Sequence, residues 1–326
     1  MKRTLHEMKT QHMYQLLLIL LIKESATMQE LIEETLLSQA SVRNMLRYLE
    51  DKRIIQEVGS DKSTGGRCAI RFSLDHSLFQ LLCLYVHENS IELEIYNYKQ
   101  CLFEEELSFG NHQELIEILK KFVEKYKITA VVIAVKGMVK GDCYITDHHN
   151  QYEEHRWVKD LKECIDVPVY LENDVKVMQL GTYFQKHINN SVYLYINDVG
   201  VGSSFMLDGH LIKGVDGLAG EIGLLPYRGV SINEAIRQCQ TKEELTSLIV
   251  HLLMMVSISF NPQIIHLSFY QDIELDIHSI KKQFYTYLNQ YYQFNVLVSY
   301  DVHDDLYDGL QYLGISSLLK LKVEEE

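Results

Sequence analysis

The sequence lacks a long hydrophobic run, which argues against a segment that crosses a membrane. Its longest uninterrupted apolar stretch, residues 16–22, contains seven residues, whereas about 20 are needed to span a bilayer. No small-residue cleavage site follows this stretch, so a secretory signal is not expected either. The sequence therefore predicts a cytoplasmic protein with no membrane partner.

Closely spaced cysteines are also absent. The six cysteines are scattered along the chain, and no two of them form a CxxC or CxC pair. This pattern predicts neither a disulfide framework nor a cysteine-rich zinc site. We therefore expect reduced cysteines that behave as small apolar residues, and neither a metal nor another cofactor.

The chain has no overall excess of positive charge, because its formal net charge is −14. On its own this value argues against binding to nucleic acid, whose phosphates attract basic proteins. The acidity is uneven, however, since residues 1–75 hold 11 basic and 10 acidic residues, while the remainder holds 20 and 35. The N-terminal segment can still bind DNA if its cations share one face.

Three helices are predicted in this segment. Residues 11–23 are rich in apolar side chains, and Thr27 with Glu30 forms a capping-box pattern at the start of a second helix. Ser38 is a suitable N-cap for a third helix that runs to about Lys52. Its apolar residues follow helical spacing and should face the core; they are Val42, Met45, Leu46 and Leu49.

The opposite face of the third helix carries side chains that can bind base edges or phosphates. No acidic residue occurs on this helix before Glu50, which favours a recognition helix in the major groove over an ordinary solvated face. The predicted DNA contacts here are Gln39, Ser41, Arg43, Asn44 and Arg47.

Two short strands, residues 54–58 and 69–74, are predicted around a small, basic loop. Gly65 and Gly66 would allow a close approach to a duplex, and Arg67 could enter the minor groove or bind phosphate. A simple hairpin turn is the alternative for this loop considered alone. Helix, turn, polar helix and basic hairpin in this order predict an N-terminal all-α/winged helix-turn-helix domain.

After residue 74 the pattern changes to alternating strands and helices in two successive series. This arrangement predicts two α/β lobes with a cleft between them. In the first series, Asn173 and Asp174 follow an apolar strand. Asp174 could accept a proton from a hydroxyl, but either residue could equally cap the next helix. In the second series, residues 200–223 contain seven glycines, which indicate tight turns and close backbone approach.

Together these passages resemble the ROK family, named for repressors, open reading frames and kinases. The matching passages are Thr64-Gly65-Gly66-Arg67, Glu172-Asn173-Asp174, Gly209 followed by Leu218-Ala219-Gly220-Glu221-Ile222-Gly223, and Asn261-Pro262. The resemblance covers nearly the whole chain. It implies an α/β, actin-like (sugar kinase-like, ribonuclease H-like), two-lobed body behind the winged helix.

The sequence departs from the family pattern where nucleotide would bind. The turn at residues 87–92, where the resemblance places the first phosphate loop, has no glycine and carries Glu88 and Glu92. Ser204 replaces the third glycine of the second phosphate loop, and Leu267-Ser268-Phe269 replaces the glycines on the adenosine side. Because phosphoryl transfer depends on such positioning groups, we expect no kinase activity.

The family's zinc site is also missing, since Leu224 stands at its histidine and Cys239 alone remains of its cysteine cluster. The resemblance nevertheless implies that Asn173, Asp174 and Glu221 contact a sugar, with Asp174 at the kinase base position.

The leading hypothesis is a transcriptional regulator, with repression favoured, that binds operator DNA and senses a sugar or sugar derivative. Residues 1–75 form the expected DNA-binding domain, residues 76–190 the first lobe and residues 191–326 the second. A homodimer or tetramer is expected, because helix-turn-helix proteins commonly read palindromes. The alternatives are an active sugar kinase with a DNA-binding domain, and a regulator whose body only oligomerises.

Overall fold

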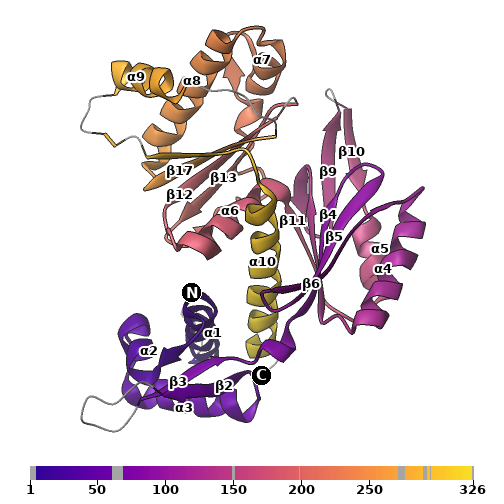
Figure 1. Cartoon of the computed structure of the whole chain (residues 1–326), viewed down its shortest axis with the longest axis vertical. Coiled ribbons are helices and arrows are strands. Elements are labelled where there is room, and N and C mark those ends of the chain that lie inside the picture. Colours follow the sequence, from indigo (N-terminus) through magenta and orange to yellow (C-terminus); the bar gives the residue numbers. More distant parts are fainter. Residues whose placement is uncertain are drawn as a thin grey trace.

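A computed structural model of the chain describes residues 5–60, 69–148, 151–197, 199–270, 276–288, 292–293 and 295–324. The chain forms a small N-terminal part and two larger lobes, each built on a five-stranded sheet (Figure 1). The two lobes confirm the predicted pair of α/β series.

The N-terminal part combines three helices with a three-stranded sheet of order β1-β3-β2. The capping box at Thr27 is confirmed, because its hydroxyl accepts the N–H of Glu30 and the Glu30 carboxylate accepts the N–H of Thr27. The two-residue strand β1 was not predicted. The elements are α1 (Leu5–Lys23), β1 (Ala26–Thr27), α2 (Met28–Thr35), α3 (Gln39–Asp51), β2 (Ile55–Ser60) and β3 (Ile70–Leu74).

The first lobe has a sheet of order β11-β7-β4-β5-β6, in which β11, β7 and β4 are parallel and β4, β5 and β6 are antiparallel. Helices α4 and α5 bury their apolar faces against it. A second, three-stranded sheet of order β10-β9-β8 was not predicted. The elements are η1 (His76–Leu78), β4 (Gln80–Val86), β5 (Ser90–Asn97), β6 (Gln100–Ser108), α4 (His112–Tyr126), β7 (Ala130–Val135), β8 (Met138–Lys140), β9 (Cys143–His148), β10 (Gln151–His155), α5 (Trp157–Cys164) and β11 (Val169–Asn173).

The second lobe has a sheet of order β14-β13-β12-β17-β18. Helix α8 packs into the core beside this sheet; among the described residues it is the one helix long and apolar enough to cross a membrane, a property that core helices share. The elements are β12 (Ser191–Ile196), β13 (Val201–Leu207), β14 (His210–Leu211), η2 (Ile222–Leu224), β15 (Pro226–Tyr227), β16 (Val230–Ser231), α7 (Ile232–Gln238), α8 (Lys242–Phe260), β17 (Ile264–Phe269), α9 (Ile277–Tyr287) and β18 (Val296–Ser299).

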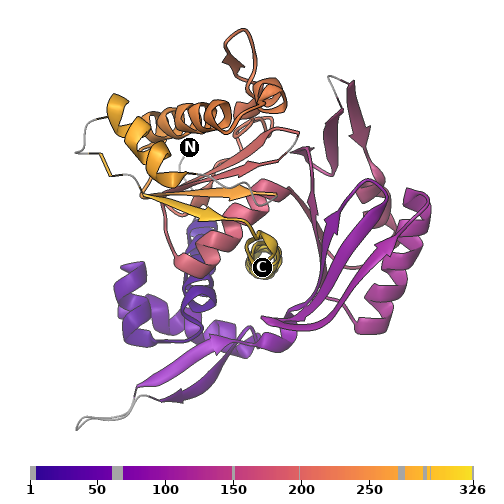
Figure 2. The same ribbon diagram turned by 45° about the horizontal axis from the view of Figure 1, so that its top comes forward.

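Two further helices, α6 (Asp174–Lys186) and α10 (His303–Glu324), pack against each other between the two sheets, as Figure 2 shows with α10 seen nearly end-on. Helix α6 contacts β12 and β13, whereas α10 contacts β4 and β7. Although α10 falls within the span expected to form the second lobe, it therefore packs on the sheet of the first. It also packs on α1, so the N-terminal part and the body share one hydrophobic core.

His266 on β17 makes the stability of the second lobe sensitive to pH. Its buried ring stacks on Tyr193, with 5.8 Å between centroids. Burial, with a smaller effect from Lys186, lowers the pKa of His266 from 6.5 to about 4. The unfolded chain therefore binds the proton at a higher pH than the folded chain does. The stabilisation by the neutral ring is complete above pH 6.5 and is lost as the pH falls towards 4.

We expect this group to lower the free energy of unfolding by about 2 kcal/mol between pH 7 and pH 5. Urea denaturation of His266→Phe, which keeps a ring for stacking, should show a pH dependence smaller by this amount. His278→Phe at an exposed position of α9 is the matched control and should behave as the native chain. An unchanged pH dependence in His266→Phe would contradict the assignment.

Candidate DNA-reading helix and effector site

Helix α3 separates apolar and polar side chains as the sequence predicted. Ser38 is its N-cap and accepts the N–H of Ser41 at 3.2 Å. Val42, Met45, Leu46 and Leu49 are buried. The five predicted DNA contacts, Gln39, Ser41, Arg43, Asn44 and Arg47, are all exposed. The helix therefore offers this polar face to a partner outside the chain.

Arg71 on β3 holds the start of α2 against the small sheet. Its guanidinium donates to the hydroxyl of Ser25 at 3.1 Å and to the Ser25 carbonyl at 2.9 Å, and it lies 3.3 Å from the Glu30 carboxylate. Leu36, between α2 and α3, adopts a left-handed conformation with φ of 57°. These features fix the turn that orients α3.

Strands β2 and β3 pair in antiparallel fashion, with a register shift between Glu57 and Gly59. Gly65, Gly66 and Arg67 lie outside the described residues, as does Thr64. Their roles in binding DNA therefore remain predictions from the sequence.

Asn173 and Asp174 lie at the junction of β11 and α6. The Asn173 side-chain oxygen caps α6 by accepting the N–H of Lys176 at 3.1 Å. Its amide nitrogen donates to the Gly137 carbonyl and to Asp174 Oδ1, each at 3.0 Å. The capping alternative is thus confirmed for Asn173, whose side chain uses both its donors and its acceptor within the protein.

The Asp174 carboxylate is 4% exposed. Burial raises the pKa of Asp174, while the N–H of Val175, the charge of Lys136 and the hydroxyl of Tyr85 act in the opposite direction. Tyr85 donates to Asp174 Oδ2 at 3.2 Å from β4, which lies two strands away from β11 in the same sheet. Tyr85 lies in a run of apolar residues, and nothing in its local sequence pattern distinguishes it from these neighbours.

Glu221 precedes η2 and is partly buried. Burial raises the pKa of its carboxyl group; nearby Lys176 lowers this pKa and Asp174 raises it. The structure therefore brings Asp174 and Glu221, which are 47 positions apart in the sequence, within electrostatic reach of each other. Among the described residues, no hydrogen bond or ion pair engages the Glu221 carboxylate.

Two lysines and a further carboxylate at this site were not singled out from the sequence. Lys176 is 2% exposed and donates to the Gly217 carbonyl at 3.0 Å. Lys213 forms an ion pair with the buried Glu172. Lys176 comes two residues after Asp174 on a helix, but the partner of Lys213 is far away in the sequence, so only the fold reveals that ion pair.

The glycines of the second lobe mainly permit close backbone packing. A Cβ at Gly217 would lie 2.5 Å from the Val139 carbonyl oxygen, and one at Gly220 would lie 2.3 Å from that of Ser203. Both glycines have positive φ. Gly217 thus brings a loop of the second lobe against β8 of the first lobe, close to Asp174.

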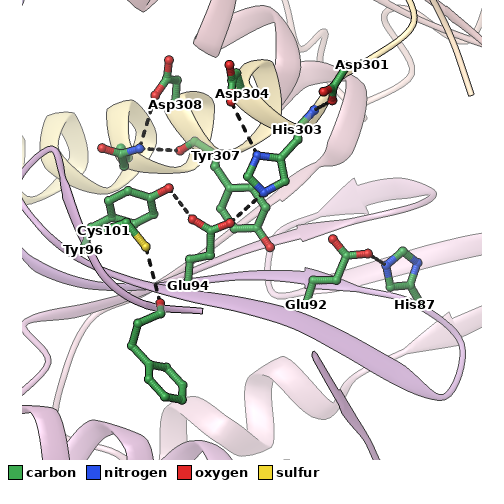
Figure 3. Close-up of polar contacts among 12 residues, drawn as sticks. His87, Glu92, Glu94, Tyr96, Cys101, Asp301, His303, Asp304, Tyr307 and Asp308 are labelled. Carbon is green, nitrogen blue, oxygen red and sulfur yellow. Dashed lines mark hydrogen bonds and ion pairs between the residues drawn. The ribbon is translucent and has the colours of Figure 1, made fainter. Parts of the chain in front are cut away.

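The turn between β4 and β5 occupies the place where the resemblance put a first phosphate loop. His87 and Glu92 form a 2.7 Å contact here, shown in Figure 3. The hydrogen bond from His87 lowers the pKa of Glu92, so the carboxylate keeps its negative charge. Glu88 is exposed on the same turn. An anionic phosphate would be repelled at this position.

Figure 3 also shows a second glutamate of the same sheet that contacts a histidine. The buried Glu94 carboxylate accepts the hydroxyl of Tyr96 and lies 2.8 Å from His303 Nε2. His303 is the first residue of α10 and its ring lies on that of Tyr307, with 4.7 Å between centroids. This contact anchors the start of α10 on the first lobe.

The second candidate phosphate loop is occupied by asparagine side chains. Asn197 Oδ1 accepts the N–H of Gly200 at 2.9 Å, and Asn233 Oδ1 accepts that of Val201 at 2.9 Å. A Cβ at Gly200 would lie 2.2 Å from Asn233 Oδ1. Ser204, at the third glycine position, is fully buried in β13. These backbone donors are therefore engaged within the protein.

The zinc positions of the family pattern hold no ligand set in the described part of the chain. Leu224 is exposed, and Cys239 donates to the Ala235 carbonyl one turn earlier. No three histidine, cysteine or acidic side chains gather into a metal-binding group among the residues that the structure describes.

Comparison with known proteins identifies the body. Residues 97–243 match the model of the ROK family. The chain carries a ROK family domain. The xylose repressor of Staphylococcus xylosus is 30% identical over 208 residues, which cover 57% of this chain and 53% of the repressor. The DNA-binding transcriptional dual regulator NagC of Escherichia coli is 23% identical over 211 residues, which cover 60% and 52%. The chain thus spans about half the length of the curated relatives it matches.

Solved structures establish the ROK fold over almost the whole chain. A ROK family transcriptional regulator, described as a homologue of the E. coli MLC protein, aligns with a TM-score of 0.71 and 17% identity over 98% of this chain and 100% of its own. A ROK hexokinase from Thermus thermophilus aligns with a TM-score of 0.53 and 15% identity over 72% of this chain and 98% of its own. The predicted actin-like, sugar kinase-like body is confirmed.

Proposed function

We infer that the chain is a sequence-specific transcriptional repressor of sugar metabolism, with a winged helix-turn-helix at residues 1–75 and a sugar-sensing body in two lobes. The exposed polar face of α3 supports this function most directly. Its four apolar residues are buried, while five side chains suited to bases and phosphates face outward. The similarity to proteins named as sugar repressors points in the same direction.

The contact between α1 and α10 supplies a route from the body to the DNA-reading helix. Leu16 and Leu20 of α1 share one core with Ile315 and Leu319 of α10. Because α10 also lies against α6, which begins at Asp174, a change in lobe arrangement would alter the support of the N-terminal part. A ligand regulates DNA affinity only if it binds the two arrangements unequally.

The kinase alternative is disfavoured by the two candidate phosphate loops. One carries the His87–Glu92 contact, and the other has its N–H groups bonded to asparagine side chains. We expect no transfer of phosphate from ATP to glucose, xylose or N-acetylglucosamine in a coupled assay. Turnover of any of these sugars would show that the body is an active enzyme.

Selection of bound fragments from genomic DNA, with and without sugars, tests the whole proposal. We expect enrichment of palindromic sites that a dimer in the cytoplasm would read, and release of these sites by one sugar. Xylose and N-acetylglucosamine are the first sugars to test, because relatives are named after them. Specific DNA binding that no sugar alters, together with no thermal shift by any sugar, would favour a body that only oligomerises.

A further inference from the structure

The carboxylate of Asp174 accepts three hydrogen bonds from the protein itself. Oδ1 accepts the N–H of Val175 at 2.8 Å and the amide of Asn173 at 3.0 Å, and Oδ2 accepts the hydroxyl of Tyr85 at 3.2 Å. The first two donors belong to the first turn and the cap of α6. They cannot leave Asp174 without unwinding the start of that helix.

The Tyr85 hydroxyl is different, because it reaches Asp174 from β4, two strands away from β11 in the same sheet, and not from α6 itself. Burial raises the pKa of Tyr85 well above its ordinary value, so the hydroxyl remains a donor at physiological pH. The ring is held by an edge contact with His87, 4.5 Å between centroids, and by the Lys136 ammonium 5.9 Å from its centroid. Movement of this buried side chain away from Asp174 would remove the donor that Oδ2 has among the described residues.

We propose that Tyr85 acts as an internal substitute for a sugar hydroxyl, and that the effector binds by displacing it from Asp174. The proposal rests on the sensor function inferred above. A sugar hydroxyl and a tyrosine hydroxyl donate to a carboxylate in the same way, so the exchange conserves the number of hydrogen bonds. A ligand must therefore bind at Asp174 more favourably than the Tyr85 hydroxyl does.

The same geometry indicates which ligands can replace the Tyr85 hydroxyl. Replacing Tyr85 requires a hydroxyl donor at Oδ2, and the partly buried Glu221 carboxylate accepts no hydrogen bond among the described residues. A neutral sugar with two suitably spaced hydroxyls satisfies both acceptors. Tyr85 is on β4 of the first lobe, whereas Glu221 belongs to the second lobe. A sugar that binds both positions would therefore couple the displacement of Tyr85 to the arrangement of the two lobes.

The test is calorimetric titration of xylose, glucose and N-acetylglucosamine into the native chain and Tyr85→Phe. The variant keeps the ring but leaves Oδ2 without its donor in the free protein, so a sugar hydroxyl no longer competes with it. We expect the sugar that binds to do so about tenfold more tightly. His87→Ala, which removes the edge contact that holds the ring, should tighten binding in the same direction by a smaller factor.

Tyr144→Phe is the matched control, because its buried hydroxyl accepts the indole N–H of Trp157 at 3.1 Å, in the first lobe, where it makes no contact with Asp174. Its affinity should equal that of the native chain. Unchanged or weaker binding by Tyr85→Phe, with the native chain binding a sugar, overturns the displacement mechanism and leaves sugar sensing intact. Absence of binding by the native chain and both Tyr85 and His87 variants overturns sugar sensing itself.

Discussion

Arg47→Glu is expected to abolish specific DNA binding, lowering affinity by at least about 100-fold at physiological salt. Arg47 lies on the exposed face of α3, where no acidic residue occurs between positions 39 and 49. The substitution removes a cation of the kind that binds phosphate or guanine and introduces an anion that the DNA backbone repels. Fluorescence anisotropy with a selected operator fragment measures the effect.

A charge reversal elsewhere separates a local contact from the effect of net charge. Lys121→Glu changes the charge by the same amount at an exposed position of α4 on the first lobe, and it should bind the operator nearly as the native chain does. Both variants should unfold at the native temperature, since neither side chain is buried. If Arg47→Glu retains native affinity, α3 is not the helix that reads DNA.

Local signals in the sequence predicted the N-terminal part well. The bounds of α2 and α3 follow from capping residues and from apolar residues at helical spacing, both of which act over a few positions. Most strands of the two main sheets were recognised from apolar runs, but β14 and β18 were not predicted. Strands β8, β9 and β10 were missed because their side chains are mixed in character and their pairing depends on one another.

Less of the candidate effector site could be predicted from the sequence. The passage from Glu172 to Asp174 was recognised through a family pattern, but the hydroxyl that donates a hydrogen bond to Asp174 belongs to Tyr85, 89 positions earlier. In an apolar strand a tyrosine looks like any core residue. Likewise, the hydrogen bond that engages the Val201 N–H in the second candidate phosphate loop comes from Asn233, which lies 32 positions later.

Gly181 and Gly309 show most clearly what the sequence alone could not reveal. Both lie inside helices, where glycine is unfavourable. A Cβ at Gly181 would lie 1.9 Å from the Asp305 carbonyl oxygen of α10, and a Cβ at Gly309 would lie 1.9 Å from the Val177 carbonyl oxygen of α6. The two glycines therefore let the backbones of α6 and α10 come into direct contact.

Gly309→Ala is accordingly expected to destabilise the protein, although alanine favours helices by about 1 kcal/mol over glycine. The added methyl group must separate two helices packed between both sheets, and we expect a net loss of about 3 kcal/mol. Chemical denaturation measures this loss. Gly110→Ala is the control, because its Cβ would meet the end of the flexible Glu114 side chain at 3.2 Å, and it should change stability little.

The effect of Gly309→Ala should extend to DNA binding, because α10 packs on α1 as well as on α6. If the α6–α10 contact connects the effector site with the DNA-reading part, separating these helices weakens the response to the effector more than it weakens DNA affinity alone. Operator binding measured with and without the sugar, at a temperature where the variant remains folded, distinguishes a weaker response to the effector from a weaker affinity for DNA. A variant that is destabilised yet keeps the full response would show that coupling takes another route.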